Sequence, residues 1–324
     1  MMDFVLIWVD GSDPVWKKEY NHYKGVIDGD KREIRFRDWD NLRYWFRGIE
    51  KFAPWVHRIH FVTCGHYPEW LNLQNPKLHF VKHSDFISPD YLPTFNSHTI
   101  ELNLHRIEGL SEQFVYFNDD LFLINKVPPS LFFKNGLPCD MAAFNMICQG
   151  PLATILMKEI DLINRHFSKR KMLVESPCKW FNLKCGKYLL RTLYLSAWPA
   201  YSGFVDLHLP NAYLKKTFDT VWQLEGKELD KTCRCKFRDD GQINQYIFRY
   251  WQLASNHFLP AALHSKFQYL ELKQGVDAVK RTIEEQKKPI LILNDEDVAD
   301  FERFKEEIKK SFEIILPEKS SFEL

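Results

Sequence analysis

The sequence predicts an α/β protein with a mixed or mostly parallel sheet and helices on its faces. Two observations predict it. Short continuous apolar runs, typical of strands buried on both faces, end in polar turns. Between them lie segments with apolar residues at helical spacing, so strands and helices alternate along the chain. The 324 residues are enough for a sizeable core, and 27% charged with 45% hydrophobic residues is ordinary globular composition.

The N-terminal part of the chain carries most of this pattern. Strands are predicted at 4–9, 58–63, 78–82 and 114–117, and helices at 39–52 and 97–107. A mostly helical insertion follows at 146–200. The remaining pattern predicts a helix at 242–253, a strand at 289–293 and a helix at 295–312. We therefore predict one domain with an α/β half at 1–145, the insertion, and the rest of the core at 201–324.

Three polar turns each follow a predicted strand, at 10–13, 63–66 and 118–120. Ligands of α/β sheets bind beyond the carboxyl ends of the strands. We therefore expect these turns to collect at one edge of the sheet and to form a binding site there.

The third turn, Asn118-Asp119-Asp120, places two adjacent carboxylates at the end of an apolar strand. Asn and Asp commonly cap turns, so a purely structural role is one interpretation. A second is that the pair holds a divalent cation that bridges a diphosphate. A third is that one carboxylate is a general base for an attacking hydroxyl.

The second and third interpretations need cations nearby that bind phosphate. Arginine suits bidentate phosphate recognition, and the candidates are Arg35, Arg37, Arg43, Arg106, Arg238 and Arg249. From this set we assign Arg43 and Arg106 to substrate binding, although spacing does not show which arginines converge.

The predicted helix at 97–107 supplies further candidates. Asn96 and Ser97 are expected to cap it, and a helix N-terminus also suits a phosphate. His98 and His105 are seven residues apart and share a face. We predict that Asn96, Ser97 and His98 contact substrate and that His105 is structural.

Bulk properties exclude several classes of protein. A formal net charge of +1 gives no overall attraction to nucleic acid. The seven cysteines lack the spacing of a zinc site, which predicts reduced thiols. No apolar run is long enough to span a bilayer, and the N-terminal run has no basic lead. These features predict a cytoplasmic protein without a nucleic-acid partner.

The three polar turns lie within longer stretches that resemble regions of a known protein family. Residues 3–16, 35–87 and 92–123 resemble the first two signature regions of the Stealth family. Residues 206–222 resemble its third region, and 237–254 with 316–323 are similar to its later region and bacterial C-terminus. The family includes bacterial capsule and exopolysaccharide phosphotransferases and the animal lysosomal-enzyme N-acetylglucosamine-1-phosphotransferase.

The resemblance implies a Rossmann-like, glycosyltransferase-A-like core whose N-terminal half binds a nucleotide sugar. The implied reaction moves a hexose or N-acetylhexosamine 1-phosphate from a UDP-sugar to a hydroxyl of a polysaccharide acceptor and releases UMP. Mg²⁺ or Mn²⁺ is the implied cofactor. A role in capsule or exopolysaccharide synthesis further implies peripheral association with a membrane-bound capsule assembly at the inner face of the membrane.

The resemblance also assigns site residues. The first region places Trp8, Asp10, Gly11 and Asp13 at the nucleotide. The second assigns Asp119 and Asp120 to the metal, with Asp120 also catalytic. His208, from a His-x-Pro match, and Arg238 complete the catalytic set, and either Asp120 or His208 is the general base. The chain departs from the family at Gln242, near which an acidic residue is common; either Asp239 or Asp240 substitutes for that acid, or the carboxylate is not needed.

Two other functions remain open from the sequence. An ordinary glycosyltransferase of the same fold would use similar contacts but attack the anomeric carbon and release UDP. A non-catalytic nucleotide- or glycan-binding subunit would bind without turnover.

Overall fold

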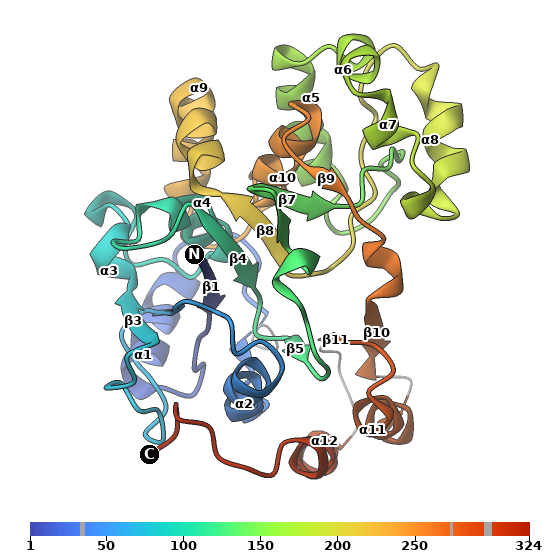
Figure 1. Ribbon diagram of the computed structural model, residues 1–324. Helices are drawn as coiled ribbons and strands as arrows, with labels where there is room; N and C mark the ends of the chain where they lie inside the picture. Colours follow the sequence, from blue (N-terminus) through green and yellow to red (C-terminus); the bar gives the residue numbers. More distant parts are fainter. Residues whose placement is uncertain (33–35, 273–274, 295–299) are drawn as a thin grey trace.

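A computed structural model describes residues 1–32, 36–272, 275–294 and 300–324. Its main sheet has the order β3-β2-β1-β4-β8 (Figure 1). Four strands are parallel: β1 (Met2–Ile7), β2 (Ile59–Thr63), β3 (Leu78–Lys82) and β4 (Gln113–Phe117). The edge strand β8 (Asn211–Leu214) is antiparallel to β4. The predicted class, an α/β fold with a mixed sheet between helices, is confirmed.

The central strand β1 shows why the apolar runs form buried strands. Phe4 and Leu6 belong to one core cluster, with α2 (Leu42–Phe52), whereas Val5 belongs to another, with α4 (Ser97–Asn103). Because successive side chains of a strand point to opposite faces, a strand between two helical layers must be apolar on both. The predicted strands therefore lie within a residue or two of the observed ones.

A second sheet joins the first through the acidic turn. It has the order β10-β11-β5 and contains β10 (Phe267–Glu271), β11 (Ile290–Asn294) and β5 (Leu121–Leu123). The chain leaves β4, turns at Asp119 and Asp120, and enters β5. The backbone N–H of Leu293 donates to the carbonyl of Asp120 at 3.0 Å, which ties the turn to β11. The acidic pair is therefore held where two sheets meet.

Several elements were not predicted. They include α1 (Pro14–Lys24), the strand β8, the strand β10, α11 (Val276–Glu285), α9 (Lys215–Cys233) and a third sheet of β6 (Phe133–Lys134), β7 (Leu137–Asp140) and β9 (Leu259–Pro260). Three predicted helices start later than expected, as α2 (Leu42–Phe52), α10 (Tyr246–Ala254) and α12 (Phe301–Ile315). Residues 295–299 of the predicted last helix lie outside the described residues.

The segment between β7 and β8 forms four helices at one end of the molecule, at the upper right of Figure 1. They are α5 (Ala153–His166), α6 (Lys169–Glu175), α7 (Pro177–Trp180) and α8 (Tyr188–Ser196). A short helix, α3 (His83–Phe86), follows β3. Within the described ranges, no helix has the length and apolar character needed to cross a membrane.

The C-terminal segment packs back onto α2. Arg47 of α2 forms a bidentate ion pair with Glu323, from Nε to Oε1 at 2.8 Å and from Nη2 to Oε2 at 2.9 Å. Both side chains are buried in the pair. Arg47 Nη1 also donates to the carbonyl of Leu316 at 2.8 Å, and Phe322 is buried in the core beside α2.

Replacing Glu323 by alanine is therefore expected to lower the free energy of unfolding by about 3 kcal/mol, because it leaves the Arg47 guanidinium buried without its main partner. Glu313, 3.2 Å from Arg47, remains as a second partner of the guanidinium and limits the loss of stability. Urea unfolding would measure it. Glu318→Ala removes an exposed carboxylate of the same segment and is the matched control. Equal stability of the two variants would contradict the importance of the pair.

Candidate active site

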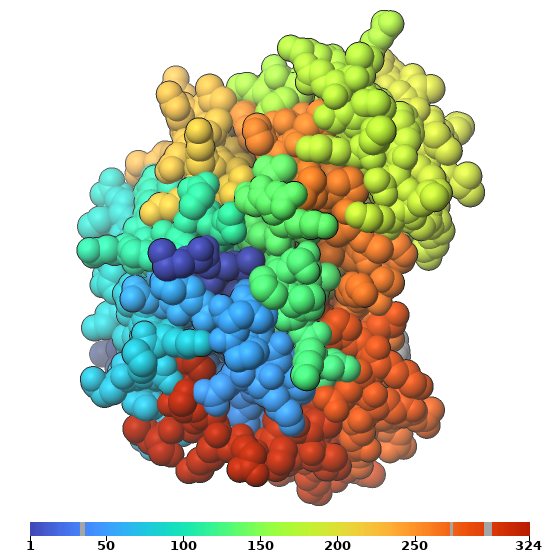
Figure 2. Space-filling model, viewed as in Figure 1, coloured from blue at the N-terminus to red at the C-terminus, as the bar shows by residue number. Residues whose placement is uncertain are grey.

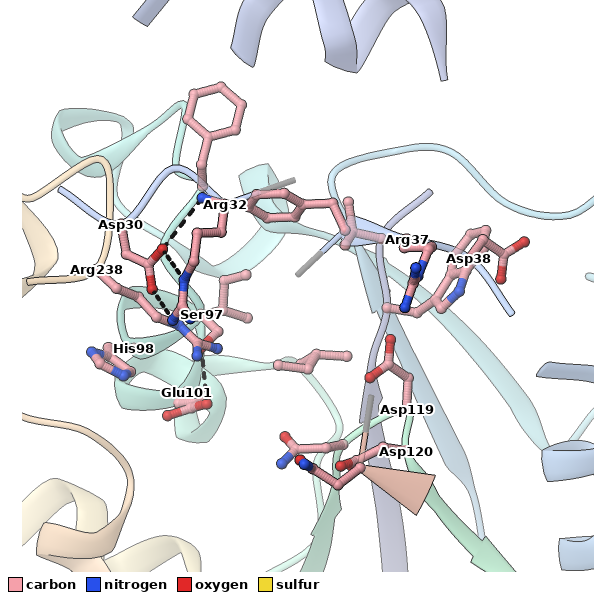
Figure 3. A pocket seen from close by; sticks show the side chains of 18 of the residues that line it. Asp30, Arg32, Arg37, Asp38, Ser97, His98, Glu101, Asp119, Asp120 and Arg238 are labelled. Carbon is pink, nitrogen blue, oxygen red and sulfur yellow. Dashed lines mark hydrogen bonds and ion pairs between the residues drawn. The ribbon is translucent and has the colours of Figure 1, made fainter. Parts of the chain in front are cut away.

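A cavity of about 1140 Å³ opens at the edge of the main sheet where β1 and β4 end. Figure 3 shows its walls, with the acidic turn on one side and Arg238 with α4 on the other. The turns after β1 and β2 are joined there, since the backbone N–H of Asp10 donates to His66 Nε2 at 2.8 Å. The predicted gathering of polar turns at one sheet edge is confirmed for these neighbouring parallel strands.

Asp119 and Asp120 both line this cavity. Burial and the adjacent charge of Asp120 together raise the pKa of Asp119 to about 7. The Asp119 side chain remains exposed to the cavity, so solvent inside it weakens this effect. Two carboxylates this close resist ionising together unless a cation lies beside them.

His208 comes from the segment before β8 and reaches the same turn. Its Nε2 lies 2.8 Å from Asp120 Oδ2. Burial opposes protonation of the ring, but the hydrogen bond to Asp120 and the charge of that carboxylate raise the pKa of His208. Asp120 thus fixes the orientation of the ring and favours the tautomer with hydrogen on Nε2. This pairing leaves Nδ1 as the basic nitrogen of the neutral ring.

The other oxygen of Asp120 supports a cation at this turn. Oδ1 of Asp120 is buried and has no hydrogen-bond partner among the described residues. A buried unpaired carboxylate oxygen is costly, and a bound cation would satisfy it. The described part of the chain contains no group of three or more ligating side chains ready to hold a metal. Two carboxylates fit Mg²⁺ nonetheless, because Mg²⁺ takes its remaining ligands from water and substrate phosphates.

Arg238 is positioned by the first turn of α4. Its Nη2 donates to the hydroxyl of Ser97, and Ser97 donates to Glu101 Oε1 at 3.2 Å. Glu101 is buried, and its pKa is raised by burial although the positive charge of Arg238 opposes that shift. Tyr116 of β4 connects this group to the acidic turn, donating to Glu101 and to Asn118 Oδ1. Arg238, Ser97 and the turn therefore belong to one hydrogen-bonded network.

Three further charged residues of the lining were not predicted as site residues. Asp30 and Arg32 lie beside Arg238 and form a bidentate ion pair at 2.8 and 2.9 Å, whereas Asp38 lies on the side of Asp119 (Figure 3). Burial raises the pKa of Asp38. The backbone N–H of Asp30 donates to the carbonyl of Arg238 at 2.8 Å, which brings this segment to the cavity. Asp30 and Arg32 carry no periodic pattern and follow no strand, so only that long-range contact identifies them.

Gln242, at the position where the family often has an acid, is buried and structural. Its Oε1 lies 3.0 Å from Asn96 Nδ2 and 2.9 Å from His98 Nδ1, and its Nε2 donates to the carbonyl of Phe237 at 2.7 Å. Because an acceptor oxygen faces both groups, His98 carries its hydrogen on Nδ1. His98 lines the cavity, whereas Asn96 caps α4 from outside the lining.

Of the four residues predicted at the first turn, only Trp8 lines the cavity. Asp10 accepts a hydrogen bond from Ser12, and Asp13 caps α1 by accepting from the backbone N–H of Trp16. Neither residue is part of the cavity lining. A Cβ on Gly11 would lie 2.2 Å from the carbonyl oxygen of Phe36, so Gly11 permits the approach of the cavity-lining segment around Phe36.

The remaining candidate arginines lie in different places. Arg37 lines the cavity, with its guanidinium 4.2 Å from the centre of the Phe301 ring. The guanidinium groups of Arg43 and Arg106 lie over Trp70 and Trp222, and neither arginine is in the lining. Arg249 is buried between Asp140 and Asp206. Arg35 lies outside the described residues.

Comparisons with known proteins agree with the resemblance. Residues 35–140 match the family described as Stealth protein CR2, conserved region 2. The capsular polysaccharide phosphotransferase WcwK of Streptococcus pneumoniae is 39% identical over 99% of this chain and 98% of that protein. The receptor polysaccharide phosphotransferase WefC of Streptococcus gordonii is 38% identical over 100% of this chain and 99% of that protein.

A third relative, the exopolysaccharide phosphotransferase cps2G of Lactiplantibacillus plantarum, is 36% identical over 99% of this chain and 96% of that protein. Among solved structures, the galactosyltransferase LgtC in complex with donor and acceptor sugar analogs matches 95% of this chain and 96% of that chain, with 12% identity and a TM-score of 0.40. That structural likeness is too low to bear on fold or function. The matches cover 96% to 99% of these three relatives, and the chain therefore belongs to the Stealth family of polysaccharide phosphotransferases.

Proposed function

We propose that this protein transfers a hexose or N-acetylhexosamine 1-phosphate from a UDP-sugar to a hydroxyl of a polysaccharide acceptor. The product is a phosphodiester, and UMP is the leaving group. The observation that carries the proposal is the pair His208–Asp120 beside Asp119, in a cavity whose opposite wall presents Arg238. Such a site combines a base for a hydroxyl, carboxylates for a cation and a cation for phosphate oxygens.

His208 is the general base in this proposal. Asp120 holds its Nε2, so Nδ1 accepts the proton of the acceptor hydroxyl as that oxygen attacks the phosphorus that bears the sugar. The raised pKa of His208 strengthens it as a base, and it must be neutral to act. In this proposal Asp120 orients the base and does not itself accept the proton; the 2.8 Å contact between His208 Nε2 and Asp120 Oδ2 supports that division of roles.

Arg238 stabilises the transferring phosphoryl group. Phosphoryl transfer collects negative charge on the equatorial oxygens, and a positioned guanidinium offsets that charge without reorganising. Ser97 and Glu101 position the Arg238 side chain before substrate arrives. Arg32 and Arg37 supply further positive charge in the cavity.

Carboxylates are numerous in this cavity: Asp30, Asp38, Glu101, Asp119 and Asp120 all line it. Those that are ionised and not paired would repel a diphosphate unless a further cation entered. Mg²⁺ or Mn²⁺ held by Asp119 and Asp120 would supply that neutralisation when bound, and would polarise the phosphate oxygens.

Cation affinity is therefore expected to depend on pH. The Asp119 pKa is raised to about 7, so below pH 7 a proton competes with the cation for this carboxylate. We expect Mn²⁺ affinity to fall as pH decreases from 8 to 6, by up to about tenfold per unit below the pKa. Calorimetric titration of the protein with Mn²⁺ alone measures this.

Asp119→Asn removes the titrating group and is expected to bind Mn²⁺ weakly, with a flatter pH dependence. Affinity that is independent of pH in the unchanged protein would show that Asp119 is not a ligand.

The reaction class is tested by the nucleotide released. Incubation with a panel of UDP-sugars and acceptor oligosaccharides should yield UMP by chromatography, with a phosphodiester resonance in the phosphorus NMR spectrum of the product. Release of UDP without that resonance would instead assign the chain to ordinary glycosyl transfer. Tight UDP-sugar binding with no turnover on any acceptor would favour a non-catalytic binding subunit.

A further inference from the structure

The helix α8 exposes apolar side chains on its outer face. Leu190 and Tyr194 are 75% and 79% exposed, and Trp198, just after the helix, is 62% exposed. With Leu193, also exposed, they stand at positions i, i+3, i+4 and i+8, which lie on one side of a helix. We call these four residues the apolar stripe. A folded protein would normally place such a row of side chains against its core.

The inner face of α8 is already packed. Thr192 and Leu195 are buried, and Thr192 Oγ1 accepts from the backbone N–H of Phe144 at 3.1 Å. The buried ammonium group of Lys169 donates to the carbonyls of Leu195 and Trp198, at 2.8 Å for Trp198. The apolar stripe is therefore held rigidly outward, since the helix cannot turn it inward without breaking these contacts.

The segment that carries the stripe contains basic residues and no acidic ones. Residues 176–205 contain four lysines and arginines and no aspartate or glutamate, whereas the whole chain has 44 basic and 43 acidic residues. Lys184, Lys187 and Arg191 are exposed and form no ion pair within the described ranges. Lys184 and Arg191 instead donate to neutral oxygens, the carbonyl of Pro260 and Oδ1 of Asn145. Their positive charge is thus available to a partner.

We propose that the apolar stripe and its basic border form a docking surface for an anionic lipid membrane. Leucine, tyrosine and tryptophan side chains enter the boundary between headgroups and acyl chains, and lysine and arginine pair with anionic headgroups. In Figures 1 and 2 this segment projects from the upper right of the molecule, so that it can meet a flat surface. Tryptophan and tyrosine, which make up half of the stripe, are side chains that membrane interfaces favour.

A second copy of the chain would fit this surface less well than an anionic membrane. In a two-fold dimer the same patch meets itself, so the basic borders of the two copies would face each other without acidic partners. An anionic bilayer satisfies both the apolar stripe and the charge. Because lysine and arginine near such a surface each add affinity that salt screens, binding should depend on both lipid charge and ionic strength.

Sedimentation of the full chain with vesicles tests this proposal independently of the reaction. Binding is expected to vesicles of phosphatidylcholine mixed with phosphatidylglycerol, and to be at least about tenfold weaker to phosphatidylcholine alone or at high salt. The triple variant Leu190→Ser, Tyr194→Ser, Trp198→Ser should lose at least about tenfold in affinity. The double variant Lys184→Gln, Lys187→Gln should weaken binding to the anionic vesicles only.

Ile314→Ser is the matched control, since Ile314 is 65% exposed on α12, at the other end of the molecule in Figure 1. Circular dichroism checks that each variant is folded. Absence of vesicle binding, or binding that the triple variant leaves unchanged, would overturn the proposal. Dimerisation in sedimentation velocity that the triple variant abolishes, without vesicle binding, would assign the surface to a second copy instead.

Discussion

Asp120→Asn is expected to lower turnover at least about a hundredfold while leaving the fold intact, the scale of losing an acid–base group. The substitution removes the carboxylate whose Oδ2 lies 2.8 Å from His208 Nε2. It also removes the negative charge that the buried, unpaired Oδ1 shares and would offer to a cation. Because Asp120 raises the pKa of His208, the residual activity of the variant should have its acidic limb displaced to lower pH. If Asp120 had only a structural role, its replacement would leave the pH of the acidic limb unchanged.

The measurement is the pH dependence of turnover for the two proteins, with and without excess chelator. Asp161→Asn is the control, because Asp161 is an exposed carboxylate of α5 that pairs with Arg165 at the surface. Full activity of Asp120→Asn, or activity that persists in chelator, would remove the cation from the proposal. An unchanged acidic limb would remove His208 as the base oriented by Asp120.

Arg238→Ala is expected to lower turnover at least about a hundredfold and to change UDP-sugar affinity little. An arginine that contacts the phosphoryl group in transit stabilises the transition state more than the bound donor. Ser97 and Glu101 are expected to act through Arg238, so Ser97→Ala should cost less than Arg238→Ala. Arg238→Lys should keep part of the activity, since a point charge replaces the planar group.

Arg234→Ala provides the matched control, because Arg234 lies four residues earlier and forms an exposed ion pair with Asp230 at 2.8 Å. Turnover and dissociation constants, measured separately for each variant, decide the matter. A loss confined to donor affinity would make Arg238 a ground-state contact, and no loss at all would place the phosphoryl group elsewhere in the cavity.

The strands β1, β2 and β4 were predictable because each is buried on both faces and therefore reads as a continuous apolar run. The strand β8 was not, since it is a four-residue edge strand with only Tyr213 buried. Helix α1 also lacks a strong apolar stripe, with only Trp16 and Tyr20 buried. Elements that bury few side chains leave a weak pattern in the sequence, whatever their length.

The candidate site was predictable where it follows strands and less so elsewhere. The acidic turn stands out because two carboxylates end an apolar run, and the resemblance supplied His208 and Arg238. Asp30 and Arg32 reach the cavity through a backbone contact between Asp30 and Arg238, and no local sequence pattern predicts that contact. Conversely, Arg43 and Arg106 have the right chemistry but lie over tryptophan rings outside the cavity lining, a placement that spacing does not reveal.

The ion pair between Arg47 and Glu323 has a consequence for synthesis on the ribosome. The helix α2 is translated early, but its buried guanidinium meets its carboxylate partner only after 276 further residues have been added. Until then, the nascent chain exposes an unfinished apolar surface that Phe322 and α12 later cover. We therefore expect the packing around α2 to be completed only after residue 323 has left the ribosome, and the nascent chain to bind holding chaperones until then.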